Sequence, residues 1–438
     1  MLIDVLIAAT WVAGVYLSKR IFSDMFTPLC VYVSTWCASL LLYRMRLVEY
    51  SVLEPKTWLL IAGGGASFCL GCVLSRARSN KSTSLQKRII VSLPWLRPAI
   101  LVLLVLDLIG FALFTERMSD TYGLGTYFTD PSIIRADAQE WTRAGAIGPL
   151  ILLCYPLLAC SLIYILESRK LSWLSAVGLI VPVAETYLLT DRLNLVTFGT
   201  CSFFIWIYHS KRRTLDRKVL CTLGGGLICF LAYFLSVGAL YGKSATHASS
   251  SFQFSTLSRD SRLGLRMLDP YVYSTASFPT FQAAMRDVDR LSWGTETFYP
   301  LARILYGVGI LERRPEASDF TFYFVPIPFN TYTWLYFFYC DFGICGAFFL
   351  PGLIGFLETA LYRRMRAAPT IFSVAGSSAF AASTAFTVFG YIQYDFILWI
   401  FLIVMFIVSR RTCTEWNGYR ATAWNELRSR GAVPPAWT

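Results

Sequence analysis

The chain has 438 residues, of which 55% are hydrophobic and only 15% are charged, and its formal net charge is +12. Soluble domains contain about 25% charged residues, so this composition excludes a soluble enzyme, an intrinsically disordered chain and a conventional nucleic-acid-binding protein. The mean hydropathy of +0.53 and repeated apolar runs of about 17–25 residues predict a polytopic helical membrane protein of the all-α class.

About eleven apolar segments separated by charged breaks are predicted transmembrane helices. They lie near residues 2–17, 26–43, 58–74, 98–114, 148–166, 172–190, 193–209, 219–241, 342–361, 371–390 and 393–409. Residues 1–241 would then hold eight transmembrane helices and an outer loop at 115–147. A large outer region with short amphipathic helices follows at 242–341, before three more transmembrane helices at 342–409 and a tail at 410–438.

The positions of lysine and arginine predict the orientation of these helices. The most strongly basic connections are 75–97, 211–218 and 362–370. Together with the other segments predicted on the same side of the membrane, they carry more than half of the 39 basic residues. The positive-inside rule assigns them to the cytoplasm, so the basic charge needs no nucleic-acid partner. Segment 44–57 is the exception. Because successive connections alternate between the two sides of the membrane, it is predicted to lie outside, although it contains Arg44, Arg46 and Lys56.

Cysteine and histidine restrict the chemistry that the chain can perform. The sequence has two histidines, His209 and His247, which excludes a His-rich metal site. Most of the 12 cysteines lie in apolar segments, where a thiol behaves as a small hydrophobic group, so no disulfide framework is expected. We therefore expect no metal and no cofactor in the reaction.

Acidic residues within or at the ends of apolar segments are costly in a bilayer and often mark function. On the predicted outer half they are Asp107, Glu185, Asp341 and Asp395. Arg192 lies in a tight outer turn and would share a helix face with Glu185 if one helix continued through both residues. The alternative for each of these residues is a structural role in helix packing.

The large outer region is rich in arginine. Arg259, Arg262 and Arg266 would share one face of a helix, and Arg303 lies in a second amphipathic patch. A guanidinium group binds phosphate through a planar fork, so this cluster, without a DxD motif, indicates metal-independent anion binding. The alternative is a solvated loop, because acids and bases are nearly balanced there. The two helix-like patches in the region cover 281–288 and 297–310.

An aromatic stretch bracketed by proline and glycine ends the outer region. Trp334, Tyr336 and Tyr339 could form an interfacial belt at the membrane surface, or they could stack on sugar rings. Several short motifs here and upstream resemble the oligosaccharide repeat-unit polymerases, the Wzy-type O-antigen polymerases. These motifs are Asn330-Thr331-Tyr332, Tyr339-x-Asp341-Phe342-Gly343-x-x-Gly346, Gly294-Thr295-Glu296-Thr297-Phe298 and the lone Arg192 between two spans.

The resemblance implies a membrane glycosyltransferase at the periplasmic face of the bacterial inner membrane. Such an enzyme transfers the growing glycan from undecaprenyl diphosphate to the next undecaprenyl-diphosphate-linked unit, in O-antigen or exopolysaccharide synthesis. Its partners would be these lipid-linked oligosaccharides and the surrounding membrane lipids, with a chain-length regulator and a flippase as candidate protein partners.

In this interpretation, arginines stabilise the diphosphate leaving group without a metal, and a carboxylate accepts a proton from the attacking hydroxyl. Asp341 and Glu185 are alternative bases. The candidate diphosphate ligands are Arg192, Arg259, Arg262, Arg266 and Arg303, and the candidate sugar ligands are Asn330, Tyr332 and Trp334. Two other functions stay open: an O-antigen ligase, for which His247 is the available outer histidine, and a lipid-linked oligosaccharide flippase or transporter.

Overall fold

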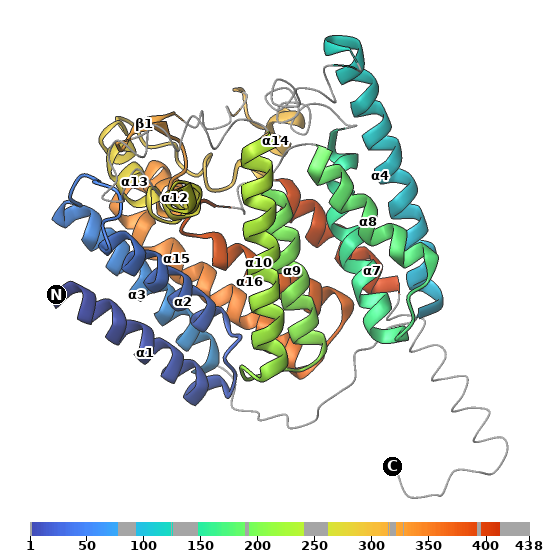
Figure 1. The fold of residues 1–438 in the computed structure, drawn as a ribbon, viewed down its shortest axis with the longest axis horizontal. Helices are drawn as coiled ribbons and strands as arrows, with labels where there is room; N and C mark the ends of the chain where they lie inside the picture. The colour runs from blue at the N-terminus through green and yellow to red at the C-terminus, as the bar shows by residue number, and fades with distance from the viewer. Residues whose placement is uncertain are drawn as a thin grey trace, which may run out of the picture.

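Helices make up almost all of the described chain, as the composition predicted (Figure 1). The structure is a computed structural model, and it describes residues 2–77, 93–123, 125, 148–188, 192–240, 262–313, 315, 321–326, 328–391 and 396–411. Two short strands, β1 (Tyr323–Phe324) and β2 (Pro328–Phe329), pair antiparallel.

The helices follow the predicted order along the chain. They are α1 (Leu2–Phe22), α2 (Pro28–Arg44), α3 (Pro55–Ala77), α4 (Leu93–Tyr122), the 3-10 helix η1 (Gly148–Leu153), α7 (Cys154–Ser168), α8 (Trp173–Leu188), α9 (Arg192–His209), α10 (Arg217–Leu240), α12 (Arg262–Thr275), α13 (Ser277–Arg286), α14 (Tyr299–Gly307), α15 (Leu335–Ala367), α16 (Ile371–Phe386) and a last helix at 396–411. Every predicted apolar segment overlaps one of these helices.

Several helices are long and apolar enough to cross a membrane. In the part of the chain that the structure describes there are five, namely Leu2–Phe22, Pro55–Arg76, Leu93–Tyr122, Pro149–Ser168 and Leu335–Ala367. Shorter apolar helices occur at Trp173–Thr186, Leu195–His209 and Ile371–Phe386. The prediction of a helical membrane protein is thereby confirmed, while the count of eleven spans stays a prediction.

Glycine residues let α3 and α15 pack with their backbones almost in contact. A Cβ atom added at Gly71 would come within 1.9 Å of the Gly352 carbonyl oxygen, and one at Gly355 within 2.5 Å of the Phe68 carbonyl oxygen. Small residues at helix contacts are typical of membrane bundles, where close backbone approach replaces the hydrophobic effect as a source of attraction. With α1 and α2, this pair forms the first of two helix groups.

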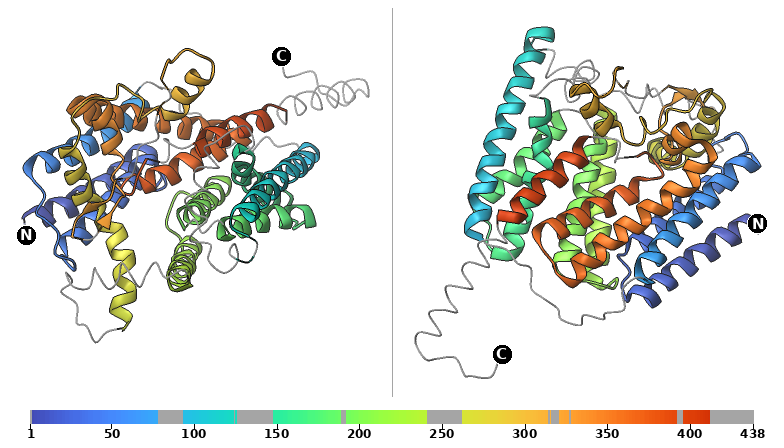
Figure 2. Two further views of the ribbon diagram at one scale, coloured as in Figure 1. Left: turned by 90° about the horizontal axis from the view of Figure 1, so that it is seen from above. Right: turned by 180° about the vertical axis from the view of Figure 1, so that it is seen from behind.

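The second group contains α4, α7, α8 and α9, which lie together on one side of the molecule in Figure 1. It shares a buried core that includes Leu104, Leu157, Ile205 and Met405. Helix α16 packs against α9 as well as against α2 and α15, so it joins the two groups. Figure 2 shows the same arrangement from above and from behind.

Helix α15 differs from the prediction at its start. We expected this span to begin at 342, but the helix begins at Leu335. Gly343 interrupts it with φ 62° and ψ −147°, a conformation that glycine adopts at little cost because it has no Cβ atom. The predicted boundary between the outer region and the membrane helix therefore falls next to a break inside α15, and residues 335–342 are helical rather than loop.

Connections predicted to face the cytoplasm meet at one end of the bundle. The Asp24 carboxylate, between α1 and α2, accepts hydrogen bonds from Tyr362 and Arg366 near the end of α15. Arg366 also donates to the Arg212 carbonyl oxygen beyond α9 over 3.1 Å. Burial raises the pKa of the Asp24 carboxyl group, and the Arg366 guanidinium opposes this effect. The shared ion pair places three distant connections on one side of the bundle.

Connections predicted to be outer meet at the other end, near α12 and α13 (Figure 1). The Tyr271 hydroxyl donates to the Leu42 carbonyl oxygen and accepts from the Leu47 N–H, each over 3.1 Å. The Gln282 Oε1 atom accepts from the Glu54 N–H over 2.6 Å. Segment 44–57 thus lies on the same side as the large outer region. The alternation of connections between the two sides requires this, in spite of the basic residues of the segment.

The buried ion pair predicts a stability effect. Asp24→Ala should lower the free energy of unfolding by about 3–5 kcal/mol, because it leaves the largely buried Arg366 guanidinium without its carboxylate partner. Thermal unfolding of the purified protein in detergent measures this change.

The control is Asp216→Ala, which removes an exposed carboxylate that pairs with Arg212 and accepts from the Val219 N–H at the start of α10, and it should cost only about 1–2 kcal/mol. Equal losses of stability in the two variants would contradict the structural role of Asp24.

Candidate functional site

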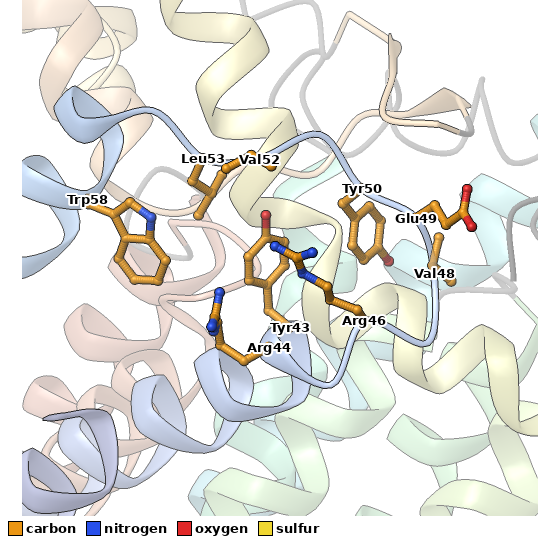
Figure 3. A pocket seen from close by; sticks show the side chains of 9 residues that line it. All are labelled: Tyr43, Arg44, Arg46, Val48, Glu49, Tyr50, Val52, Leu53 and Trp58. Carbon is orange, nitrogen blue, oxygen red and sulfur yellow. The ribbon is translucent and has the colours of Figure 1, made fainter. Parts of the chain in front are cut away.

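A pocket opens at the predicted outer end of α2, beside the connection to α3. Its volume is about 330 Å³, and its lining residues are Tyr43, Arg44, Arg46, Val48, Glu49, Tyr50, Val52, Leu53 and Trp58 (Figure 3). Two guanidinium groups and three aromatic rings therefore surround one cavity. In the view of Figure 3, the Arg44 and Arg46 guanidinium groups lie on either side of the Tyr43 ring, while the Glu49 carboxylate points away.

The two arginines of the pocket are held differently. Arg44 Nε donates to Asp4 Oδ1 over 2.7 Å, so the end of α2 is tied to the start of α1. Arg46 follows the helix with φ 52°, in the left-handed region, and no carboxylate in the described ranges forms an ion pair with it. Arg46 is therefore the guanidinium group of the pocket that is available to an anion.

The outer region fixes the wall of this pocket. The Tyr50 hydroxyl bonds to Thr275 Oγ1 over 2.8 Å, and burial raises the pKa of this phenol above its ordinary value, so it stays a neutral hydroxyl. The Thr57 hydroxyl donates to Gln282 Oε1 over 3.0 Å. Lys56 Nζ lies 2.8 Å from the Tyr339 hydroxyl. The basic side chain of Lys56, at the start of α3, thereby contacts the first part of α15, which carries the 339–346 motif.

Asp341 serves as an anchor for the loop that precedes α14. Its side chain is fully buried, and its carboxylate accepts from the backbone N–H groups of Glu296 over 3.1 Å and Thr297 over 2.5 Å. Two of the resembling motifs, at 294–298 and 339–346, are thus brought into contact by one side chain. A carboxylate that satisfies two buried N–H groups is already committed to a structural contact.

Three glycines complete this junction. Gly294 has φ 97° in the loop that Asp341 holds, and Gly343, two residues after Asp341, has φ 62° at the helix break. Gly346 lies so close to the preceding turn that an added Cβ atom would come within 2.2 Å of the Phe338 carbonyl oxygen. The glycines of the two motifs are explained by backbone geometry at the junction.

Trp334 and Tyr332 occupy the core rather than an open surface. Trp334 is fully buried and packs against Tyr32, Phe68 and Phe338. Tyr332 is 2% exposed, and its hydroxyl donates to the Thr321 carbonyl oxygen over 2.6 Å. Neither ring has a free face for a sugar, so the predicted sugar contacts of these two residues are replaced by packing contacts.

The condition under which Glu185 and Arg192 would share a helix face, one helix through both residues, is not met. Helix α8 ends at Leu188 and α9 begins at Arg192, so the two residues belong to different helices. Glu185 instead lies against Asp107 of α4 and Cys154 of α7. Neither Glu185 nor Asp341 opens on the pocket, because Asp341 is fully buried and Glu185 is 3% exposed.

The structure describes only some of the remaining candidate site residues. Arg262 and Arg266 lie in α12, which bears out their predicted helical spacing, and Arg303 is half-buried in α14. Asn330 is half-buried beside β2. The side chains of Arg192, Arg262 and Arg266 lie outside the described part of the structure, as do Arg259, His247 and Asp395 altogether.

The two predicted amphipathic patches are helices α13 and α14. On α14 and the residue before it, Phe298, Leu301 and Ile304 are each at least 40% exposed. An exposed apolar face of this kind suits the surface of a membrane.

Sequence reasoning missed the pocket as a site, although a signal for it was present. Arg44, Arg46 and Lys56 broke the positive-inside pattern, and basic residues on the outer side need another reason to be there. No known protein family, curated protein or solved structure matches this chain. The candidate site therefore stands on the residues of this chain.

The anchoring contact of Asp341 can be tested by substitution. Asp341→Ala leaves two buried N–H groups without an acceptor, at a cost of about 1–3 kcal/mol for each, so protein abundance and thermal stability should fall. Asp341→Asn keeps one acceptor oxygen and should lose less. Immunoblotting and thermal unfolding measure both variants.

Asp289→Ala is the control, because Asp289 is an exposed acid of the same outer region. A stable Asp341→Asn protein that has lost all activity would instead identify Asp341 as the base and contradict the anchoring role.

Proposed function

We propose that the protein polymerises lipid-linked oligosaccharide repeat units. It transfers the growing glycan from undecaprenyl diphosphate to the next undecaprenyl-diphosphate-linked unit, in O-antigen or exopolysaccharide synthesis. A bundle of about eleven transmembrane helices in the bacterial inner membrane, with the site on the periplasmic side, belongs to this proposal.

The observation that carries the proposal is the pocket that contains Arg44, Arg46 and three aromatic rings. The Arg46 guanidinium suits a diphosphate, because it can present two parallel N–H donors to phosphate oxygens, while Arg44, held by Asp4, adds positive charge beside it. Aromatic side chains with a polar tip suit sugar, since they offer an apolar face and a hydrogen bond together. The resemblance of the 294–298 and 339–346 motifs to the polymerases supports the same substrate class.

The chemistry balances without a resident metal. A hydroxyl oxygen of the incoming unit attacks the anomeric carbon of the growing glycan, and the bond from that carbon to the diphosphate oxygen breaks. Undecaprenyl diphosphate leaves with the bonding electron pair, and Arg46, with Arg44, stabilises the developing negative charge. The Glu49 carboxylate points away from the two arginines, so in this proposal the proton of the attacking hydroxyl passes to water at the open pocket.

The test is deletion of the gene, followed by a gel of surface polysaccharide and analysis of the lipid carrier. A polymerase deletion should leave single repeat units on the carrier or core. Loss of a ligase would leave long chains on the carrier, and loss of a flippase would leave units that extracellular enzymes cannot reach. Either of these two patterns would replace the proposal.

Variants of Arg46 test the pocket in the deletion strain. Arg46→Ala should lower the rate of chain extension by about 10²–10³, the usual cost of removing a donor to transition-state charge. Arg46→Lys should recover part of the rate, because lysine keeps the charge but loses the planar fork. The readout is the distribution of chain lengths at equal protein abundance.

Arg290→Ala is the matched control, since Arg290 is an exposed arginine of the outer region that does not line the pocket. A stable and fully active Arg46→Ala protein would remove the pocket from the proposal.

Arg192 provides a separate test, because it begins α9 at the predicted outer surface. If it binds the diphosphate, Arg192→Lys should lose much of the activity and Arg192→Ala nearly all, at unchanged protein abundance. If it only holds the turn, Arg192→Ala should lower abundance and Arg192→Lys should be nearly silent. Immunoblots and polysaccharide gels of the same strains separate the two outcomes.

A further inference from the structure

Three potential metal ligands from three helices converge inside the second helix group. They are Asp107 of α4, Cys154 at the start of α7 and Glu185 of α8, and one donor atom of each lies within 4.8 Å of the others. All three are buried, with exposed fractions of 0%, 6% and 3%. The helices that carry them lie across the bundle from the pocket at the end of α2 (Figure 1).

The carboxyl groups of this cluster lack the contacts that burial demands. No donor from outside the cluster reaches the four oxygens of Asp107 and Glu185 in the described part of the chain, and the two carboxyl groups lie close enough to each other and to the Cys154 backbone to interact only within the cluster. An unsatisfied buried polar group is costly, and two like charges side by side in an apolar interior cost far more unless something compensates them. The cluster therefore needs protons or a cation between its members.

Close helix packing holds the three donors toward one point. Gly110 lies one turn from Asp107 on the same face of α4, and a Cβ atom there would come within 2.6 Å of the Leu150 Cβ atom, just before α7. Gly178 lies two turns before Glu185 on α8, and a Cβ atom there would come within 2.3 Å of the Ser161 Oγ atom of α7. The first contact packs α4 against η1 and the second packs α8 against α7, and η1 runs directly into α7 at Cys154, which fixes the geometry of the donors.

We propose that Asp107, Cys154 and Glu185 bind one divalent transition-metal cation of the zinc type. Zinc accepts cysteine sulfur together with carboxylate oxygen, and three protein ligands leave its fourth position for water. A harder cation such as magnesium prefers oxygen alone and keeps several waters, which the thiol and the burial of this site disfavour. The donor set thus selects a borderline metal.

Proton release sets the pH dependence of this site. With all three groups protonated, the metal-free cluster is neutral. Zinc binds thiolate and carboxylate, so the thiol and both carboxyl groups each release a proton to water when the cation enters. The divalent cation then offsets two of the three negative charges, and binding should weaken as the pH falls.

The metal site does not rest on the proposed function, and its role is to join α4, α7 and α8. The sequence analysis expected no metal in the glycan transfer, and a cation among these helices is compatible with transfer at the pocket. The loss of metal binding and the loss of polymerase activity can therefore be measured separately.

The experiment uses the full-length protein, purified in detergent with a tag that contains no histidine. After removal of metals with a chelator, the protein is dialysed against zinc or cobalt. We expect one zinc per chain by elemental analysis, and with cobalt a thiolate-to-metal charge-transfer band. Asp107→Asn, Cys154→Ser and Glu185→Gln should each lose stoichiometric zinc, and Cys154→Ser should also lose the band.

Cys160→Ser is the matched control, because Cys160 is a buried cysteine of the same helix whose thiol faces Met405; this variant should bind like the wild type. Zinc should also raise the unfolding temperature of the wild type and not that of Glu185→Gln, which tests the site even if Cys154→Ser fails to fold. A wild-type protein that binds no zinc, or variants that bind it as the wild type does, would overturn the proposal.

Discussion

The outer end of the molecule depends on the hydrogen bonds that Tyr271 and Gln282 accept from the connection between α2 and α3. They join residues more than two hundred positions apart in the chain. Without them, segment 46–54 would be a short exposed link, and the arginine and tyrosine side chains on it would not share a cavity. The large outer region thus acts first as a support that shapes a pocket on a neighbouring segment.

Charged side chains are paired differently at the two ends of the bundle. At the predicted cytoplasmic end, Asp24 and Arg366 neutralise each other in a buried pair with Tyr362. At the predicted outer end, Arg44 is balanced by Asp4, whereas Arg46 is left at the pocket without an ion-pair partner among the described residues. The first arrangement stabilises a fold, and the second leaves positive charge available for an anion.

The motifs that prompted the resemblance to polymerases have a structural explanation in this chain. Asp341 anchors the loop at 294–298, and Gly294 and Gly343 permit the turns on either side of that contact. A short motif of this kind preserves a junction between an outer helix and a membrane helix. The chemistry of the proposed reaction then falls to side chains on other segments, which the motif helps to position.

The sequence by itself determined the helical membrane class, the order of the helices and the two sides on which the connections meet. These features follow from runs of apolar residues and from the spacing of charges, which are local properties of the chain. It also indicated the helical arginine spacing in α12 and the amphipathic α14.

Only the tertiary structure decided which side chains meet. Trp334 was a candidate sugar ligand and is in the core, and Glu185 was a candidate base and lies against Asp107 and Cys154. The physical reason is that burial and donor convergence depend on which helices pack together, and no periodicity within one helix specifies its neighbours. Close glycine contacts pack the three helices that bring Asp107, Cys154 and Glu185 together. The packing role of a glycine depends on which helix lies opposite it, and the sequence of one helix does not show this.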